Sequence, residues 1–410
     1  MTLFKPSPLS MNRPNPKSDS FAQENNTTAS KNFDLFLFAG ERSGDLHGGK
    51  LLKALHDKDP SLQIFGVGGE TMREQCFSCY LRTEEFQVMG FIDVFFALPK
   101  LIKLFKATVR MILEQKPKIV ILIDYPGFNL RLARALKKKG YQGKIFHYIC
   151  PSVWAWGKKR IPLMASCLDK LLSILPFEKT CFEHTSLSVE YVGHPLCATI
   201  AQHAYTPIEI PEGKRVIAIF PASRYKELKR NLKILLDAAK KLQQTDPNLY
   251  FVFSCSQSCF RAFLKKSIVS YGFLEGSEFQ IVDAKKSYDL MRLSYMALAK
   301  SGTVTLELAL HKVPTVVVYR IAKVDLFIAK SLLRIRLPYY SLPNILCQKG
   351  VFPELFGPNF TKDALFSKAL VFLKDASAHL RCQQDCQELI ELLGTTDAHC
   401  ETAQIIKNTL

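Results

Sequence analysis

From residue 33 onward, short apolar runs alternate along the chain with amphipathic stretches. The runs have the length of buried strands, and the stretches between them carry apolar residues at helical spacing. The pattern predicts strands at 33–39, 62–67, 118–123, 144–149, 170–174, 189–192, 215–220, 249–254, 278–282, 295–299 and 314–318. Such alternation is typical of parallel, doubly wound sheets, so we predict an α/β fold.

The predicted strands form two series, which the Pro-containing segment 203–214 separates. A chain of 410 residues is also too long for one ordinary hydrophobic core. We therefore predict two Rossmann-like domains, at 33–202 and 203–360, that face a central cleft, and helices at 361–410 that pack back on the body. Residues 1–32 are rich in Asn, Ser, Thr, Pro and Lys, and this composition predicts a disordered tail.

The formal net charge of +18 says more about the partners of the protein than the hydropathy does. It indicates an anionic partner, which is membrane lipid, nucleic acid or a phosphorylated substrate. No apolar run approaches the roughly 18 residues of a membrane-spanning helix, so none is expected. The 12 cysteines are scattered rather than set in a disulfide framework, which favours a reducing cytosol.

A glycine-rich stretch follows the first predicted strand, between Gly40 and Lys50. Its glycines are spaced by four, at Gly40, Gly44 and Gly48, and match neither the dinucleotide fingerprint nor the P-loop. Glycines let backbone amides approach an anion, but a tight strand-to-helix turn that binds nothing explains them equally well. We expect a loop here and a helix from Lys50 onward.

Ligands of doubly wound sheets bind beyond the carboxyl ends of the strands. At one such end the sequence SGTVTLE (301–307) joins a strand to a helix, and its small residues leave backbone N–H groups for a diphosphate. Glu307 lies one turn further on, where its carboxylate can bind the ribose hydroxyls. Arg224 ends another strand-end turn, and its guanidinium suits the same diphosphate. The alternatives are a capped helix with a solvated glutamate and a surface arginine.

Asp124 ends the apolar strand 118–123 and is the candidate general base. A carboxylate at that position is partly desolvated, and desolvation raises its pKa toward a useful value. The alternative, an N-cap or Asx turn leading into Pro126, is equally compatible with the sequence.

Residues 91–113 have the pattern of an interfacial amphipathic helix. Pro99 suits a first helical turn. A basic stripe follows an apolar one, so we predict a membrane contact through Phe95, Phe96, Lys100, Lys103, Lys106 and Arg110. The alternative is a core helix with a solvated basic face.

Together, the strand-end segments resemble one known family. They are AGERSGD (39–45), MGFIDV (89–94), DYPGFN (124–129), PSVWAW (151–156), LPFEK (175–179), VGHP (192–195), SGTVTLE (301–307) and SLPN (341–344). In this order they look like lipid-A-disaccharide synthase, and the resemblance extends from residue 33 to at least residue 345. The pattern departs at Ala222, where glycine is usual, at Arg42, where a small residue is common, and after Pro195, where an acidic residue is often found.

The resemblance implies an inverting, metal-independent glycosyltransferase of the GT-B type that needs no cofactor. It would condense UDP-2,3-diacylglucosamine with 2,3-diacylglucosamine 1-phosphate to give the lipid A disaccharide 1-phosphate and UDP. It would work in the cytoplasm, peripherally on the inner membrane of a Gram-negative bacterium, with an anionic membrane surface as partner and no nucleic acid. A homodimer stays open.

The resemblance also implies roles for residues that match the family's motifs. Asp124 would be the catalytic base. The UDP-sugar would contact Arg224, Ser301, Gly302, Thr303, Glu307 and Asn344, and a substrate loop would contain Gly40, Glu41, Ser43, Gly44 and Asp45. Whether that loop touches donor or acceptor stays open.

Two rival functions make different demands on the sequence. A UDP-sugar 2-epimerase would share the two-domain architecture, but it needs a pair of acid/base groups around C2 and no acyl-binding surface. A nucleic-acid-binding protein should show basic patches interleaved with aromatic residues, whereas the charges here are spread along the chain.

Overall fold

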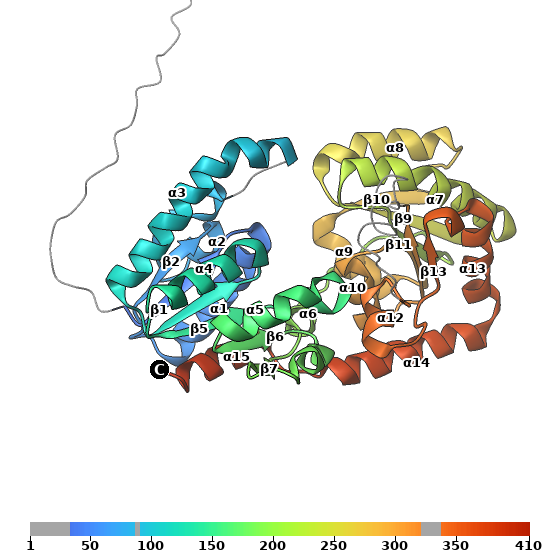
Figure 1. Cartoon of the computed structure of the whole chain (residues 1–410). Coiled ribbons are helices and arrows are strands. Elements are labelled where there is room, and N and C mark those ends of the chain that lie inside the picture. Colours follow the sequence, from blue (N-terminus) through green and yellow to red (C-terminus); the bar gives the residue numbers. More distant parts are fainter. Residues whose placement is uncertain (1–32, 87–90, 321–337) are drawn as a thin grey trace, which may run out of the picture. The chain divides into compact units, whose positions relative to one another are not determined.

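The computed structural model describes residues 33–86, 91–320 and 338–410, with side chains at all of these except 91–97 and Trp156. The predicted tail at 1–32 lies outside the described residues. Two parallel sheets organise the described chain, and each has helices on both faces (Figure 1). The α/β fold class predicted from the alternating pattern is therefore confirmed.

The first sheet has seven strands in the order β3-β2-β1-β4-β5-β6-β7. They are β1 (Leu35–Ala39), β2 (Ile64–Gly68), β3 (Ser78–Arg82), β4 (Ile119–Ile123), β5 (Lys144–Tyr148), β6 (Lys170–Ser173) and β7 (Ser188–Tyr191). The helices in this part are α1 (Arg42–Lys58), α2 (Glu70–Arg73), α3 (Phe91–Gln115), α4 (Pro126–Lys138), α5 (Ile161–Cys167) and α6 (Pro195–Ala201).

The central strands β1 and β4 are apolar at every position because helices cover both of their faces. Alternate residues of β1 point to opposite faces: Phe36 and Phe38 join the cluster under α3 and α4, and Leu35 and Leu37 join the cluster under α1. The register is parallel, with Phe36 opposite Val120 of β4. The carboxyl ends of β1 and β4 therefore reach the same edge.

The second sheet has six strands in the order β10-β9-β8-β11-β12-β13. They are β8 (Arg215–Phe220), β9 (Leu249–Cys255), β10 (Phe279–Asp283), β11 (Met296–Lys300), β12 (Thr315–Tyr319) and β13 (Glu354–Phe356). The helices that follow along the chain are α7 (Tyr225–Thr245), α8 (Arg261–Ser270), α9 (Ser287–Leu293), α10 (Thr303–Leu310), α12 (Leu342–Cys347), α13 (Lys362–Lys374), α14 (Ala376–Leu393) and α15 (Ala398–Lys407).

The last helix, α15, returns to the first sheet and packs beside α1 (Figure 1). Ala403 and Ile406 enter the core cluster that contains Leu51 and Leu55 of α1. Lys58 Nζ also donates a 2.8 Å hydrogen bond to Gln404 Oε1. Residues far apart in the sequence thus complete one face of the first sheet.

Every predicted strand is present within two residues at each end, but β3 and β13 were missed. β3 is an edge strand of alternating exposure with the mixed sequence SCYLR, and β13 has only three residues. Neither offers the apolar run on which the prediction rests. Hydropathy finds buried strands and overlooks polar or very short ones.

One predicted helix start and one predicted proline position were wrong. The helix α1 begins at Arg42 rather than Lys50, so most of the expected glycine loop is helical. The helix α3 begins at Phe91 and contains Pro99 in its interior rather than in its first turn. Among the described helices, none combines the length and apolar character required to cross a bilayer.

Candidate active site

Asp124 lies directly after β4, on a backbone that turns in an unusual way. Asp124 and Tyr125 both have left-handed conformations, with φ of 48° and 45°. Non-glycine residues adopt this region at a cost of about 1–3 kcal/mol each, and such strain concentrates at functional sites. The buried Asn129 side chain holds the turn by donating to the carbonyls of Ile123 and Asp124, at 3.2 and 2.6 Å.

The Asp124 carboxyl is partly buried, and this burial raises its pKa above the ordinary value. Hydrogen bonds from the Tyr125 backbone and the Ser43 hydroxyl offset part of that rise. Burial also raises the pKa of Glu41, and the negative charge of Asp124 adds to the increase. These two acids and Ser43, all predicted from the sequence, thus lie together at the ends of β1 and β4.

The glycines after β1 serve packing. A Cβ at Gly40 would lie 2.4 Å from the Tyr125 ring, and one at Gly48 would lie 2.5 Å from Met72 Sδ. Gly44 and Gly48 are four residues apart in α1, so they share one helical face and allow the helix to approach the sheet. Close packing against Tyr125 therefore explains Gly40, and residues 40–45 form a tight entry into α1 that places Glu41 and Ser43 beside Asp124.

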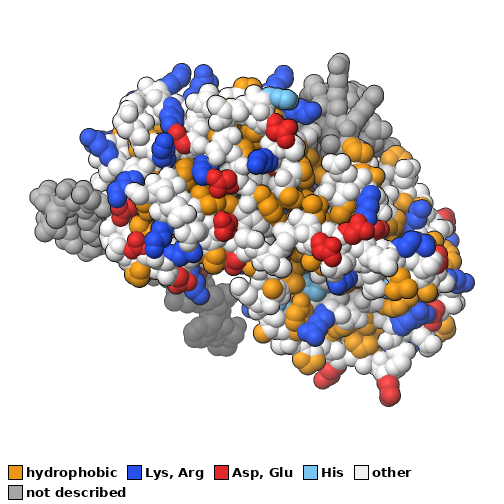
Figure 2. Space-filling model, turned by 90° about the horizontal axis from the view of Figure 1, so that it is seen from below, with side chains coloured by type: hydrophobic (Ala, Val, Ile, Leu, Met, Phe, Trp, Pro, Cys, Tyr) orange, Lys and Arg blue, Asp and Glu red, His pale blue; other side chains and the backbone are white. Residues whose placement is uncertain are grey.

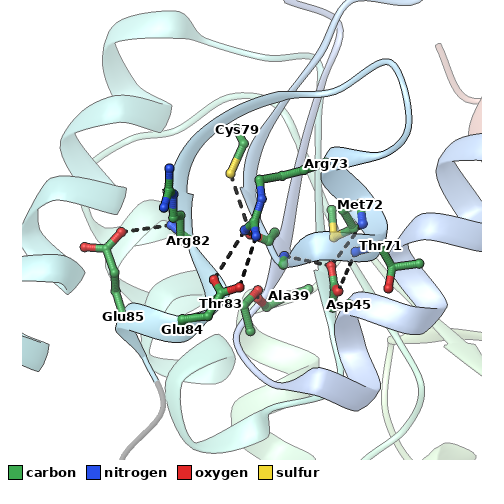
Figure 3. Close-up of polar contacts among 12 residues, drawn as sticks. Ala39, Asp45, Thr71, Met72, Arg73, Cys79, Arg82, Thr83, Glu84 and Glu85 are labelled. Atoms are coloured by element: carbon green, nitrogen blue, oxygen red, sulfur yellow. Dashed lines mark hydrogen bonds and ion pairs between the residues drawn. The ribbon is translucent and has the colours of Figure 1, made fainter. Parts of the chain in front are cut away.

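Asp45, predicted as a substrate contact, has a structural role instead (Figure 3). It is 5% exposed. Its carboxylate accepts hydrogen bonds from the backbone N–H groups of Gly69, Thr71 and Met72, at 2.7, 3.0 and 3.1 Å. Asp45 therefore neutralises the N-terminus of α2 and ties it to α1, which leaves its oxygens engaged within the protein.

A cavity of about 590 Å³ contains Asp124 and Ser43. The loops after β4, β5, β6 and β7 contribute to its walls, as expected from the strand-end rule. The polar and charged residues that line it are Ser43, His47, Lys50, Asp124, Ser152, Arg160, Glu178, His194, Thr199 and Thr303. We call it the Asp124 cavity.

Glu178 is a second acid of the Asp124 cavity, and the sequence analysis did not single it out. It is 1% exposed and accepts a 2.6 Å hydrogen bond from Ser173 Oγ. Burial raises its pKa to about 7. The signal available in the sequence was its place in the strand-end segment LPFEK.

A smaller cavity of about 280 Å³ lies at the carboxyl edge of the second sheet. The segments after β8, β9, β10 and β11 line it, and they are rich in small hydroxyl residues. Its polar and charged lining residues are Ser223, Ser254, Ser256, Ser287, Lys300, Ser301, Thr303 and Glu307. We call it the Glu307 cavity.

The 301–307 segment has the geometry expected of an anion site. Thr303 begins α10, and Gly302 before it provides no side-chain cap for the first N–H groups. A Cβ at Gly302 would meet no protein atom within 4 Å, so the space beside it is open. Burial raises the pKa of Glu307, whose Oε1 lies 3.4 Å from the Tyr288 hydroxyl. The structure thus brings Ser301, Gly302, Thr303 and Glu307 to one cavity.

The predicted phosphate ligand Arg224 does not line the Glu307 cavity, whereas Lys300 does. Arg224 has a side chain that is 82% exposed, and its Nη1 lies 3.7 Å from Glu227 Oε1. Lys300 Nζ lies 3.3 Å from the other oxygen of Glu227, in a pair whose side chains are 18% and 17% exposed. One carboxylate therefore holds two cations beside the cavity. Lys300, the last residue of β11 and directly before SGT, was the missed signal.

Asn344, expected at the UDP-sugar, lies outside the Glu307 cavity. It is 1% exposed. Its Nδ2 donates to Phe352 O and Glu354 Oε1, at 2.8 and 2.9 Å, and its Oδ1 accepts from Phe352 N at 2.8 Å. These bonds join α12 to the start of β13 and to the segment before it, so Asn344 has a structural role here.

Helix α3 divides into two parts. Leu104, Val109 and Ile112 are buried in the core of the first sheet. Leu98 and Ile102 are 48% and 47% exposed. The basic residues of the predicted stripe are exposed: Lys100, Lys103, Lys106 and Arg110. The predicted contacts Phe95 and Phe96 fall among the side chains that the structure does not describe.

Comparison with known proteins agrees with this arrangement. The sequence model of the family described as lipid-A-disaccharide synthetase matches residues 35–409. The chain is 38% identical to lipid-A-disaccharide synthase of Chlamydia pneumoniae over 383 residues, which is 92% of this chain and 62% of that protein. It is 36% identical to the enzyme of Pseudomonas putida over 348 residues, 83% of this chain and 90% of that one. The chain thus spans about 60% of the length of its chlamydial relatives.

Solved structures resemble the fold at low sequence identity. A putative UDP-N-acetylglucosamine 2-epimerase from Listeria monocytogenes gives a TM-score of 0.62 at 14% identity, over 90% of this chain and 94% of that one. The glycotransferase of kitacinnamycin gives 0.60 at 12%, over 92% and 99%. These likenesses indicate the GT-B type of fold. The family assignment rests on the sequence matches. The chain belongs to the lipid-A-disaccharide synthetase family.

Proposed function

We propose that this protein condenses UDP-2,3-diacylglucosamine with 2,3-diacylglucosamine 1-phosphate, giving the β-1′,6-linked lipid A disaccharide 1-phosphate and UDP. The observation that carries the proposal is the pairing of two cavities with complementary chemistry. The Asp124 cavity contains a desolvated carboxyl, and the Glu307 cavity contains an uncapped helix N-terminus beside cations. Thr303 lines both cavities, so donor and acceptor sites would meet there.

In this reaction Asp124 takes the proton of the acceptor 6-hydroxyl as its oxygen attacks C1 of the donor sugar. The bond from C1 to the diphosphate breaks, and UDP leaves with the electron pair. Attack from the face opposite UDP inverts the configuration at C1. The N-terminus of α10 and the cations Lys300 and Arg224 stabilise the charge that develops on UDP, while Glu307 binds the ribose.

The proposal needs no metal ion, because the α10 N-terminus and two cations provide the positive charge for the diphosphate. Turnover should therefore persist in EDTA. A loss of turnover that Mg²⁺ restores would contradict this part of the proposal.

The direct test is incubation of the purified chain with both substrates and detection of the disaccharide by mass. A second arm with UDP-N-acetylglucosamine alone tests the epimerase alternative, since epimerisation at C2 needs no acceptor. Disaccharide formation without epimerised product is expected. Epimerisation without disaccharide would overturn the proposed function.

Acylated substrates remain in a bilayer, so we also propose that the enzyme works peripherally at the cytoplasmic face of the inner membrane. The support is the exposed part of α3, where Leu98 and Ile102 lie beside basic residues. On the face seen in Figure 2, Lys and Arg side chains are spread among acidic ones, which does not favour a nucleic-acid site there. The homodimer stays a prediction, which sedimentation velocity can test.

The membrane proposal predicts that replacing Lys100, Lys103, Lys106 and Arg110 by Gln releases the protein from anionic liposomes. Each basic residue near an anionic surface contributes about 1 kcal/mol, so the four together provide most of a salt-sensitive attachment. Co-sedimentation at low and high salt measures the effect. A matched variant with Lys137, Lys138, Lys139 and Lys144 changed to Gln removes the same charge elsewhere and should still bind. Equal binding by the α3 variant and the wild type would exclude this helix as the contact.

A further inference from the structure

The Asp124 cavity contains two basic side chains that the reaction described above does not use. Among the described residues that line it, Lys50 and Arg160 are the only Lys or Arg side chains. Lys50 lies on α1, and Arg160 is the residue before α5. The two cations therefore come from separate elements and share one cavity.

The protein positions Lys50 at the cavity wall. Its Nζ donates a 2.8 Å hydrogen bond to Thr199 Oγ1, and Thr199 in turn donates to Pro195 O at 2.9 Å. Thr199 and Pro195 line the same cavity. An ammonium has three N–H donors, so this contact orients Lys50 and leaves it the capacity to bind an anion.

Arg160 follows a π-helical turn, Val153–Gly157, that is part of the strand-end segment after β5. Its side chain is partly buried at the cavity, where a guanidinium binds oxyanions through paired N–H groups. The preceding Lys158 and Lys159 are exposed and do not line the cavity. Arg160 is thus distinguished from its basic neighbours by where it lies.

Near pH 7 the histidines of the cavity carry little charge, and the negative charge of Glu178 is reduced. Burial lowers the pKa of His47 and of His194 to about 4, so both are neutral near pH 7. Burial raises the pKa of Glu178 to about 7, so much of its negative charge is lost there. Asp124 remains as the principal carboxylate against two cations. The cavity therefore favours a ligand that carries an anionic group.

We propose that Lys50 and Arg160 bind the 1-phosphate of the acceptor sugar. The inference rests on the proposed function, in which the acceptor is a hexosamine whose reacting hydroxyl is at C6 and whose phosphate is at C1. The sugar ring separates these groups, so one end of the acceptor faces Asp124 while the phosphate meets the cations. A cavity of about 590 Å³ is large enough for a phosphorylated hexose. The pair makes the enzyme select phosphorylated acceptors.

The test compares acceptors with and without the 1-phosphate. The wild type should use the phosphorylated acceptor with the higher kcat/KM, and Arg160→Met and Lys50→Met should each reduce that preference about tenfold. The double variant should approach equal use of both acceptors, and Arg160→Lys should recover part of the preference. Lys158→Met and Lys159→Met are matched controls that should keep it. UDP affinity and thermal midpoint should stay near wild type.

Outcomes separate this inference from the function on which it rests. An active variant that keeps the full preference, or loses activity equally on both acceptors, overturns the phosphate site and leaves the transferase proposal intact. A wild type that forms no disaccharide overturns both. If the variants do not fold, soluble glucosamine 1-phosphate and glucosamine serve as competitors of the wild type. Stronger competition by the phosphate is expected, and equal competition overturns the site.

Discussion

The two cavities lie at equivalent edges of two similar sheets, yet their polar groups are arranged in opposite ways. At the first sheet, partial burial desolvates the Asp124 carboxyl, so its pKa rises. At the second, Glu227 contacts both Arg224 and Lys300, so the charges beside the cavity are paired. A base gains from desolvation, whereas a diphosphate site needs cations held ready. In the proposed reaction, equivalent sheet edges would serve these two purposes through the residues that follow each strand.

The backbone conformations of the turns after β4 and β11 also differ. The turn after β4 has two successive left-handed non-glycine residues, Asp124 and Tyr125, fixed by the buried amide of Asn129. The turn after β11 is extended at Gly302, with φ of 162°, which any residue adopts without strain. Strain at the first edge is consistent with one carboxylate that must point in one direction. At the second edge, an open backbone lets N–H groups approach the ligand.

The largest expected effect comes from Asp124→Asn. The amide keeps the shape of the side chain but cannot take a proton, so kcat should fall by about 10²–10⁴-fold. UDP affinity should stay near wild type because Asp124 does not line the Glu307 cavity. Steady-state kinetics and UDP titration measure the two quantities separately.

Asp289→Asn is a matched control for the loss of a buried carboxylate. Asp289 is 4% exposed and accepts from Thr206, away from both cavities. Its replacement should lower the thermal midpoint and leave kcat of the folded protein largely unchanged. An Asp124→Asn enzyme that keeps most of its turnover would exclude Asp124 as the base. The proposed contrast between a base at the first sheet edge and a diphosphate site at the second would then be wrong.

The sequence predicted which sheet edges carry the candidate sites better than it predicted the hydrogen-bond partners of individual residues. Apolar runs located the buried strands, and the rule that ligands bind beyond strand ends brought Asp124, Ser43 and Glu307 to cavities. Asp45 and Asn344 look equally functional in the sequence, but their side-chain oxygens accept hydrogen bonds from the backbone N–H groups of Gly69 and Phe352. Such partners become visible only when the chain folds.

An intermediate effect is expected from Glu307→Ala, which removes the proposed ribose contact. Losing hydrogen bonds to a charged group costs about 1.5–3 kcal/mol, or about tenfold or more in the Kd of UDP. Arg224→Ala should fall at the lower end of this range because its side chain is 82% exposed. Isothermal titration with UDP measures both. Unchanged affinity in both variants would place the nucleotide outside the Glu307 cavity.

The smallest expected effect comes from Lys300→Met. This variant tests most directly which groups at the edge of the second sheet bind the diphosphate. Because Glu227 already neutralises part of the Lys300 charge, Lys300 should contribute about 1 kcal/mol to UDP binding, or about fivefold in Kd. Uridine lacks the diphosphate, so its affinity should not change. The exposed Lys229 on α7 offers the control Lys229→Met, which should bind both ligands as the wild type does.

Lys300 could affect UDP indirectly, because removing it leaves Glu227 without its 3.3 Å partner in a partly buried site. The double variant Lys300→Met/Glu227→Gln removes both charges and should regain thermal stability. If Lys300 binds the diphosphate, the double variant still binds UDP more weakly than the Glu227→Gln single variant does. Full recovery of UDP affinity in the double variant would mean that Lys300 acts only by neutralising Glu227. The second edge would then depend on the α10 N-terminus and Arg224 for its positive charge.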